Sequence, residues 1–240
     1  MTRLTWILES SGRTNVEVGG GIIIPVCIFA KPPVPAEVKT RLIPALGAAG
    51  AAELASAMLL DIWRTVELCP GVRPILATTL PGDFPVSVSP DDVWLQGDGD
   101  LGERIERIFN HGLLQAHSVI AVGADSPALT AAHLQAALDA LQTNDVVVGP
   151  SADGGFYLLG LRSRQAGLFY SLPWSSSQTL QVLKKRISER WLSIAELEPL
   201  FDVDTPSDLL TLQEHLLSHP SLAPATRAWC HRNPIRVILE

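Results

Sequence analysis

The stretch "HSVIAVGADSPALT", His117 to Thr130, decides the fold class of this chain. Its first half is a short apolar run rich in β-branched residues, as expected of a strand that is buried on both faces of a parallel sheet. A lone carboxylate, Asp125, stands at the end of this strand, before a small polar residue and a proline. A carboxylate in such a place is costly without a partner, which is either a helix N-terminus or a metal ion.

The same alternation of apolar strands and periodic helices extends along most of the chain. Strands connected by helices of this length form βαβ units, so we predict an α/β fold. We expect a three-layer α/β/α sandwich with a mostly parallel, Rossmann-like sheet and helices on both faces. Pro25 marks either the beginning of the first strand or a bulge. The predicted strands cover residues 21–30, 73–79, 92–96, 118–124, 145–151 and 154–161, and the predicted helices cover 48–68, 101–115 and 131–142.

Composition narrows the class of function. The chain has 240 residues, of which 47% are hydrophobic, which fits one large α/β domain better than two small ones. A formal charge of -7 argues against a nucleic-acid surface. We find neither the order of segments of a signal peptide nor an apolar run of roughly 18 to 20 residues, so we expect a cytoplasmic protein without a membrane span.

Polar clusters follow the predicted strands at the points where the strands end. Because ligands of open α/β sheets bind beyond the carboxyl ends of the strands, we expect these clusters to meet in one cleft. The four clusters are "AKPPVPAEVKTRL" at 30–42, "QGDGDLGER" at 96–104, "GADSP" at 123–127 and "GPSADGG" at 149–155.

Two of these loops suit a phosphorylated ligand. The first places Lys31, Lys39 and Arg41 among three prolines, which restrict the chain and lower the entropic cost of presenting cations to an anion. Its alternative interpretation is a solvated helix start in "AEVKTRL". The glycines of "QGDGDLGER" allow a close approach of backbone to ligand at a helix N-terminus, although a plain turn explains them as well.

Several carboxylates are candidates for metal binding or catalysis. Hard divalent cations such as Mg2+ take carboxylate oxygens together with phosphate oxygens and water, so Asp125, Asp202 and Asp204 are candidate ligands. "DTPSDL" is also a good helix start with Thr205 as N-cap. Asp153 lies either in a hairpin turn or in the site as a carboxylate on the acceptor side.

Six motifs occur together and in order: "FAKPPVPAEVKTRL", "GDLGERI", "GADSPALT", "GPSADGGFYLLGL", "PWSSSQTL" and "FDVDTPSDL". As a set they resemble the bacterial DUF2064 family, whose members are described as glycosyltransferase-like with the GT-A, or nucleotide-diphospho-sugar transferase, fold. Some members are labelled arsenosugar-biosynthesis glycosyltransferases. The fold is also similar to that of 2-phospholactate guanylyltransferases and molybdenum-cofactor nucleotidyltransferases. The resemblance runs from about residue 22 to 215, which implies an N-terminal extension (1–20), one GT-A-like domain (21–218) and a C-terminal tail (219–240).

The resemblance also implies roles for particular residues. Asp125 corresponds to the metal-binding aspartate of the GT-A fold. Together with the candidates taken from the residues themselves, the predicted catalytic residues are Asp125, Asp153 and Lys39, and the predicted metal ligands are Asp125, Asp204 and Asp202. The implied nucleotide and phosphate contacts are Ala30, Lys31, Lys39, Arg41, Gln96, Gly97, Asp100, Gly102 and Arg104. The candidate acceptor contacts, which come from the residues themselves, are Gly154, Gly155 and Trp174. Two departures stand out: Ser126 and Pro127 follow Asp125 where a DxD motif is usual, and Ala36 replaces a usual glycine.

These residues lead to three hypotheses. The first is a Mg2+- or Mn2+-dependent transferase that moves a glycosyl group from a nucleotide-activated donor to a small-molecule acceptor. The second is nucleotidyl transfer from a nucleoside triphosphate to a phosphorylated small molecule, with release of pyrophosphate. The third is a nucleotide-binding module without turnover.

Overall fold

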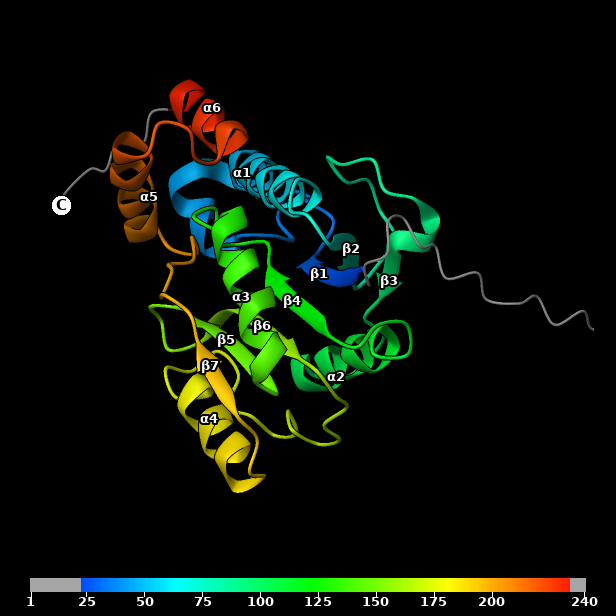
Figure 1. Cartoon of the computed structure of the whole chain (residues 1–240). Coiled ribbons are helices and arrows are strands. Elements are labelled where there is room, and N and C mark those ends of the chain that lie inside the picture. Colours follow the sequence, from blue (N-terminus) through cyan, green and yellow to red (C-terminus); the bar gives the residue numbers. More distant parts are fainter. Residues whose placement is uncertain (1–22, 234–240) are drawn as a thin grey trace, which may run out of the picture.

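The computed structural model describes residues 23–233 and has three layers, with one mixed sheet between two layers of helices (Figure 1). This arrangement confirms the predicted α/β sandwich. The strands are β1 (Ile24–Ala30), β2 (Val72–Thr78), β3 (Val93–Leu95), β4 (Val119–Gly123), β5 (Val146–Pro150), β6 (Phe156–Leu161) and β7 (Ile194–Glu196). The helices are α1 (Ile43–Glu67), α2 (Leu101–Gly112), α3 (Ala131–Thr143), α4 (Thr179–Glu189), α5 (Pro206–Ser218) and α6 (Pro224–Arg232), with short 3-10 turns at Thr40–Leu42 and Pro90–Asp92.

The order of the strands creates a switch point in the middle of the sheet. The order is β3-β2-β1-β4-β6-β5-β7, and only β6 among these strands runs antiparallel to its neighbours. The chain proceeds from β1 outward to β2 and β3, and then returns to place β4 on the other side of β1. The strand order therefore reverses between β1 and β4, and ligands of open α/β sheets bind at such a switch point, beyond the carboxyl ends of the strands.

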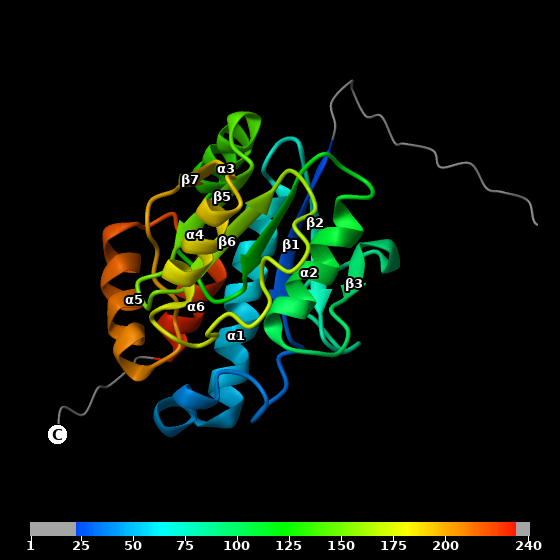
Figure 2. The same ribbon diagram turned by 90° about the horizontal axis from the view of Figure 1, so that it is seen from below.

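Each face of the sheet has its own apolar core. On one face, β1 side chains such as Val26 and Ile28 pack with α1 and α3. On the other face, Cys27 of the same strand packs with α2 and α4, as the alternation of side chains along a strand requires. Figure 2 shows the two pairs of helices on opposite sides of the sheet.

A third core lies between helices, on the outer side of α1. There, α5 and α6 pack on α1 around Met58, Leu212 and Trp229, all of which are buried. The carboxylate of Asp61 on α1 accepts hydrogen bonds from the backbone N–H groups of Ala225 (2.9 Å) and Thr226 (2.7 Å), and so caps the first turn of α6. Helix α6 falls in the segment 219–240 that the sequence leads us to place in a tail, and its packing joins residues 224–232 to this core.

Helix α1, with the turn that precedes it, is by length and composition alone apolar enough to span a membrane, and it is the one such segment among residues 23–233. Core helices of soluble proteins pass the same test. This helix is interrupted at Gly47, whose backbone (φ 70, ψ 165) is not helical, and its buried side chains contribute to two of the three cores. We therefore describe α1 as a core helix.

The predicted strands and helices agree with the structure to within a few residues over 24–161. Pro25 is the second residue of β1 and precedes its pairing with β4, so it marks the beginning of the strand. The sequence did not predict β7 or α6, which are short or weakly patterned. Thr205 is the N-cap of α5, as predicted, and it also forms a capping box with Asp208.

Candidate functional site

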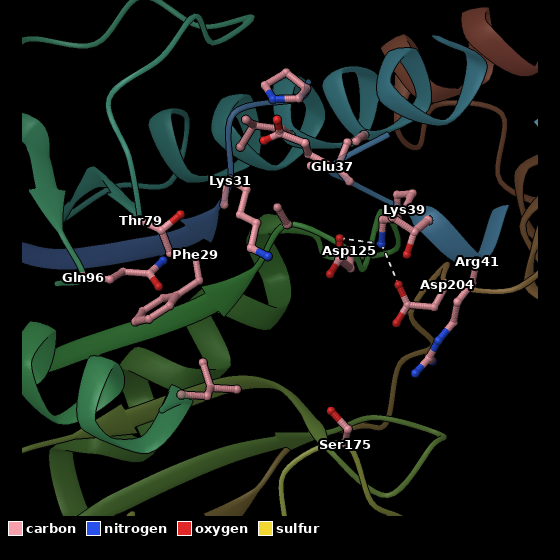
Figure 3. Close-up of a pocket in the computed structure, with 18 of the residues that line it drawn as sticks. Phe29, Lys31, Glu37, Lys39, Arg41, Thr79, Gln96, Asp125, Ser175 and Asp204 are labelled. Atoms are coloured by element: carbon pink, nitrogen blue, oxygen red, sulfur yellow. Dashed lines mark hydrogen bonds and ion pairs between the residues drawn. The ribbon is translucent and has the colours of Figure 1, made fainter. Parts of the chain in front are cut away.

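The predicted loops meet in one pocket at the carboxyl edge of the sheet, with a volume of about 630 Å³. The loop after β1 forms one wall, Asp125 follows β4, and Asp153 follows β5. Figure 3 shows Lys31, Thr79 and Gln96 on one side of Asp125, Arg41 and Asp204 on the other, and Ser175 below Asp125 in this view. The predicted residues that line the pocket are Ala30, Lys31, Lys39, Arg41, Gln96, Arg104, Asp125, Asp153 and Asp204.

An ion cluster of Lys39, Asp125 and Asp204 lies at the centre of this pocket. The ammonium Nζ of Lys39 is 2.5 Å from Oδ1 of Asp125 and 2.8 Å from Oδ1 of Asp204 (Figure 3). Burial alone would lower the pKa of Lys39, but the charges and hydrogen bonds of the two carboxylates outweigh it, so the pKa is raised. Lys39 therefore stays charged, and it holds together two carboxylates that are 79 positions apart in the chain.

The loop that presents Lys39 is held in an unusual backbone conformation. Both Ala36 (φ 68) and Lys39 (φ 47, ψ 41) occupy the left-handed region, which costs energy for residues other than glycine. A short 3-10 turn, Thr40–Leu42, follows and continues directly into α1, so a helix does start within "AEVKTRL", but the side chain of Lys39 just before it is buried rather than solvated. The positive φ of Ala36 gives a physical reason for the glycine that the resemblance leads us to expect there.

A backbone hydrogen bond connects the segment that carries Asp125 to the segment that carries Asp204. The N–H of Val203 donates to the carbonyl of Asp125 (2.9 Å), which ties the loop before α5 to the end of β4. The carboxylate of Asp208 accepts from the N–H groups of Asp204 (3.0 Å) and Thr205 (2.7 Å). The capping box of α5 thereby also fixes the backbone that carries Asp204.

Asp202, the third predicted ligand, is not among the residues that line the pocket. Its carboxylate accepts a hydrogen bond from the hydroxyl of Ser126, which is buried. Burial raises the pKa of Asp202, and the nearby charges of Asp125 and Asp153 raise it further, against the hydrogen bond from Ser126. Ser126, which stands within the altered DxD motif, thus points to Asp202.

Three further cations of the pocket lack a carboxylate partner among residues 23–233: Lys31, Arg41 and Arg104. Lys31 and Arg41 are exposed on the loop after β1, whereas Arg104 comes from α2 and buries its Nε without a hydrogen-bond partner. In a chain with a net charge of -7, three unpaired cations around one pocket favour an anionic ligand.

The glycine-rich loop contributes less to the pocket than predicted. Gln96 lines it, and its Nε2 donates to the carbonyl of Ala77 (2.8 Å), which fixes the side chain. Gly97 and Asp100 are outside the lining, and Asp100 is instead the N-cap of α2, where its Oδ1 accepts from the N–H of Glu103 (2.9 Å). Gly102 is required by packing, because a Cβ there would lie 2.5 Å from the carbonyl oxygen of Phe169.

The residues predicted to contact an acceptor do not line the pocket, but three serines near them do. Ser175, Ser176 and Ser177 line the pocket, whereas Gly154, Gly155 and Trp174 do not. Gly154 has a positive φ of 88°, and a Cβ there would lie 2.2 Å from the carbonyl oxygen of Ser177, so this glycine lets the serines approach the end of β5. Trp174 packs edge-to-face on Phe156 (6.2 Å between ring centroids). The motif "PWSSSQTL" contained the signal for these serines, which the sequence analysis did not single out.

Two carboxylates of the pocket have the exposure and the arrangement that a divalent cation requires. Oδ1 of Asp125 and Oδ1 of Asp204 converge on one point, the Lys39 ammonium, and the two carboxylate side chains remain 48% and 44% exposed. Two accessible carboxylates are the protein ligands that Mg2+ commonly uses when phosphates and water supply the rest. No group of three or more His, Cys, Asp and Glu residues that could hold a metal occurs within residues 23–233. The residues therefore fit a cation that is bound jointly with a phosphorylated ligand.

Comparison with solved structures identifies the class of fold. The chain is similar to a protein of Desulfovibrio desulfuricans G20 that is provisionally named a nucleotide-diphospho-sugar transferase, with 26% identity, a TM-score of 0.79, and coverage of 87% of this chain and 94% of the other. It is also similar to a CMP:2-keto-3-deoxy-manno-octonic acid synthetase in complex with CTP (14% identity, TM-score 0.50, coverage 82% and 99%). A third similar structure is 4-diphosphocytidyl-2C-methyl-D-erythritol synthase of Anaerococcus prevotii (11% identity, TM-score 0.52, coverage 82% and 97%). The fold is thus that of nucleotide-diphospho-sugar transferases and nucleotidyltransferases.

A family model also matches part of the chain. The model of the family described as "Uncharacterized protein conserved in bacteria (DUF2064)" matches residues 88–176. The match confirms the resemblance over that range, which includes the glycine-rich loop, Asp125 and Asp153. No curated protein matches the chain.

Proposed function

We propose that this protein is a transferase that binds a nucleotide-activated donor together with Mg2+ or Mn2+ in the pocket at the switch point. One observation carries this proposal: Lys31, Arg41 and Arg104, unpaired among the described residues, surround two accessible carboxylates that converge on one point. Unpaired cations suit the phosphates of a nucleotide, and the carboxylates suit a cation that bridges to those phosphates.

The reaction we favour is glycosyl transfer to a small-molecule acceptor. It is supported by the fold and by the similarity to the provisionally named nucleotide-diphospho-sugar transferase. In this reaction an acceptor oxygen forms a bond to the anomeric carbon, the bond from that carbon to the phosphate oxygen breaks, and a nucleoside diphosphate leaves. A bound divalent cation would supply electrostatic stabilisation of the leaving diphosphate.

The residues of the chain would divide these tasks. Lys31 and Arg41 would hold the phosphates and stabilise the charge that develops on them. Asp153 lines the pocket and has one oxygen, Oδ1, fixed by the N–H of Gly155 (2.8 Å). We assign it the role of the base that takes the proton of the acceptor. The hydroxyls of Ser175 and its two neighbours would orient the acceptor.

A second candidate reaction is nucleotidyl transfer from a nucleoside triphosphate to a phosphorylated acceptor. It is supported by the three cations of the pocket that are unpaired within residues 23–233, Lys31, Arg41 and Arg104, because a triphosphate requires more positive charge than a diphosphate. In this reaction an acceptor oxygen forms a bond to the α-phosphorus, and pyrophosphate leaves.

The leaving group distinguishes the two reactions. We would incubate the protein and Mn2+ with nucleotide sugars or nucleoside triphosphates, together with a panel of small hydroxylated and phosphorylated acceptors, and separate the products by ion-exchange chromatography. Release of a nucleoside diphosphate supports glycosyl transfer, and release of pyrophosphate supports nucleotidyl transfer. D125N serves as the control for contaminating activity. Binding of nucleotides without any release would favour the binding module.

A further inference from the structure

The ammonium of Lys39 occupies the point at which the two carboxylates converge. Its Nζ contacts one oxygen of Asp125 (2.5 Å) and one oxygen of Asp204 (2.8 Å). The side chain of Lys39 is only 5% exposed, whereas the carboxylates are 48% and 44% exposed. The lysine is thus almost fully shielded from solvent, whereas each carboxylate remains accessible from the pocket.

The fold of the loop holds Lys39 in this position. Its backbone is in the left-handed conformation (φ 47, ψ 41), and its carbonyl accepts a hydrogen bond from the N–H of Leu42 (2.8 Å). Leu42 itself is fully buried among the residues of α1 and α5. The lysine is therefore anchored at its backbone, and only its side chain is free to change partners.

We propose that Lys39 is a built-in counter-ion that excludes a free divalent cation from the Asp125–Asp204 pair. This inference rests on the proposed function, in which the same pair binds the metal. The ammonium neutralises one of the two negative charges and uses the very oxygen atoms on which a cation would bind, so the pair attracts a free cation weakly.

The nucleotide phosphates would relieve this block. A phosphate in the pocket offers the ammonium another anion and offers the cation oxygen ligands that the protein lacks. The cation would then enter as a complex with the nucleotide, and Lys39 would turn from the carboxylates to the phosphates. Lys39 thereby couples occupation of the metal site to the presence of the donor.

Removing the charge of Lys39 tests the proposal directly. We would titrate Mn2+ into nucleotide-free protein and measure unbound Mn2+ by electron paramagnetic resonance. We expect the neutral variant K39M to bind Mn2+ at least about tenfold more tightly than the wild type, because one positive charge is lost in direct contact with the ligands. K31M is the matched control, since it removes the same charge from an exposed lysine of the pocket, and its affinity should change by less than about threefold because solvent and salt screen that charge.

The variants are expected to fold, because the exposed carboxylates that remain can be hydrated. Circular dichroism checks this, and K39Q is the second variant if K39M does not fold. Restoring weak binding with the double variant K39M/D125N would show that the gain depends on the proposed ligand. Affinity of folded K39M or K39Q equal to that of the wild type would overturn the proposal.

A parallel titration separates this proposal from the proposed function. It repeats the Mn2+ titration of the wild type in the presence of each nucleoside triphosphate and nucleotide sugar. Binding of Mn2+ with a nucleotide, but no gain in K39M, would overturn the counter-ion role alone. No Mn2+ binding under any condition, in wild type or variants, would overturn both.

Discussion

Replacing Ser126 with alanine tests the hydrogen bond that holds the carboxylate of Asp202. The hydroxyl of Ser126 is buried and donates to the carboxylate of Asp202 across 76 positions of the chain. A hydrogen bond to a charged group contributes about 1.5–3 kcal/mol, so S126A should lower the free energy of unfolding by about that amount. For a domain of this size the melting temperature should fall by about 3–12 °C.

A double-mutant cycle isolates the contact. The free energy of unfolding is measured by urea denaturation for S126A, D202A and the double variant. D202A alone leaves the buried hydroxyl of Ser126 without its acceptor, so the two single losses should exceed the loss in the double variant by about 1–3 kcal/mol. A coupling energy below about 0.5 kcal/mol, the usual error of additivity, would refute the reasoning.

A variant of Asp202 also shows whether this residue only positions the site or binds the metal itself. D202N keeps a side-chain oxygen that can accept the hydrogen bond from Ser126. It removes the carboxyl group of Asp202, whose pKa is raised by burial. We therefore expect nucleotide-loaded D202N to bind Mn2+ within about threefold of the wild type. D125N and D204N, which are matched changes of charge in the pocket, should lose this binding. Equal losses in all three variants would make Asp202 a third ligand.

Three further predictions concern the scaffold of the site. A36G should stabilise the protein by up to about 1 kcal/mol in urea denaturation, because glycine adopts the φ of 68° without strain, and a clear loss would contradict this. Burial lowers the pKa of His133, which caps α3, against a smaller opposing effect of Glu198; the free energy of unfolding should therefore be highest above about pH 6.5 and decrease as the pH falls through the folded-state pKa. H133Q, which keeps an acceptor at that position, should flatten this decrease between about pH 7 and 5, and an unchanged slope would count against the assignment. D61A should cost about 1–2 kcal/mol and speed amide hydrogen exchange in α6 more than in α3, and equal rates in both would argue against the cap.

The sequence predicted the fold well because the elements that build it are strongly patterned. Short apolar runs rich in β-branched residues, such as residues 118–124, are typical of strands that are buried on both faces. The segments between them repeat their apolar residues with the period of a helix. By contrast, α6 has a weak apolar face, and its place depends on the capping carboxylate of Asp61, a contact across 164 positions that no local pattern contains.

The candidate site was predicted in part for the same reason. Asp125 and the basic loop follow strands, so strand order alone brings them to one edge. The pairing of Lys39 with two carboxylates depends on left-handed backbone at Lys39, and the turn of Ser126 toward Asp202 depends on which side chains are buried. Neither is encoded in residue type or spacing. The sequence also did not predict that Ser175, Ser176 and Ser177 line the pocket, because the close approach of Ser177 to Gly154 is a tertiary contact.

The most direct test of the account is a thermal-shift panel of nucleoside triphosphates and nucleotide sugars, each with Mg2+, Mn2+ or EDTA, on the wild type and D125N. A ligand that binds only the folded state raises the melting temperature, by an amount set by its affinity. We expect at least one nucleotide to stabilise the wild type with Mg2+ or Mn2+, and we expect EDTA or D125N to abolish the shift. Stabilisation that is the same with metal, with EDTA and in D125N would contradict a metal-dependent nucleotide site at Asp125.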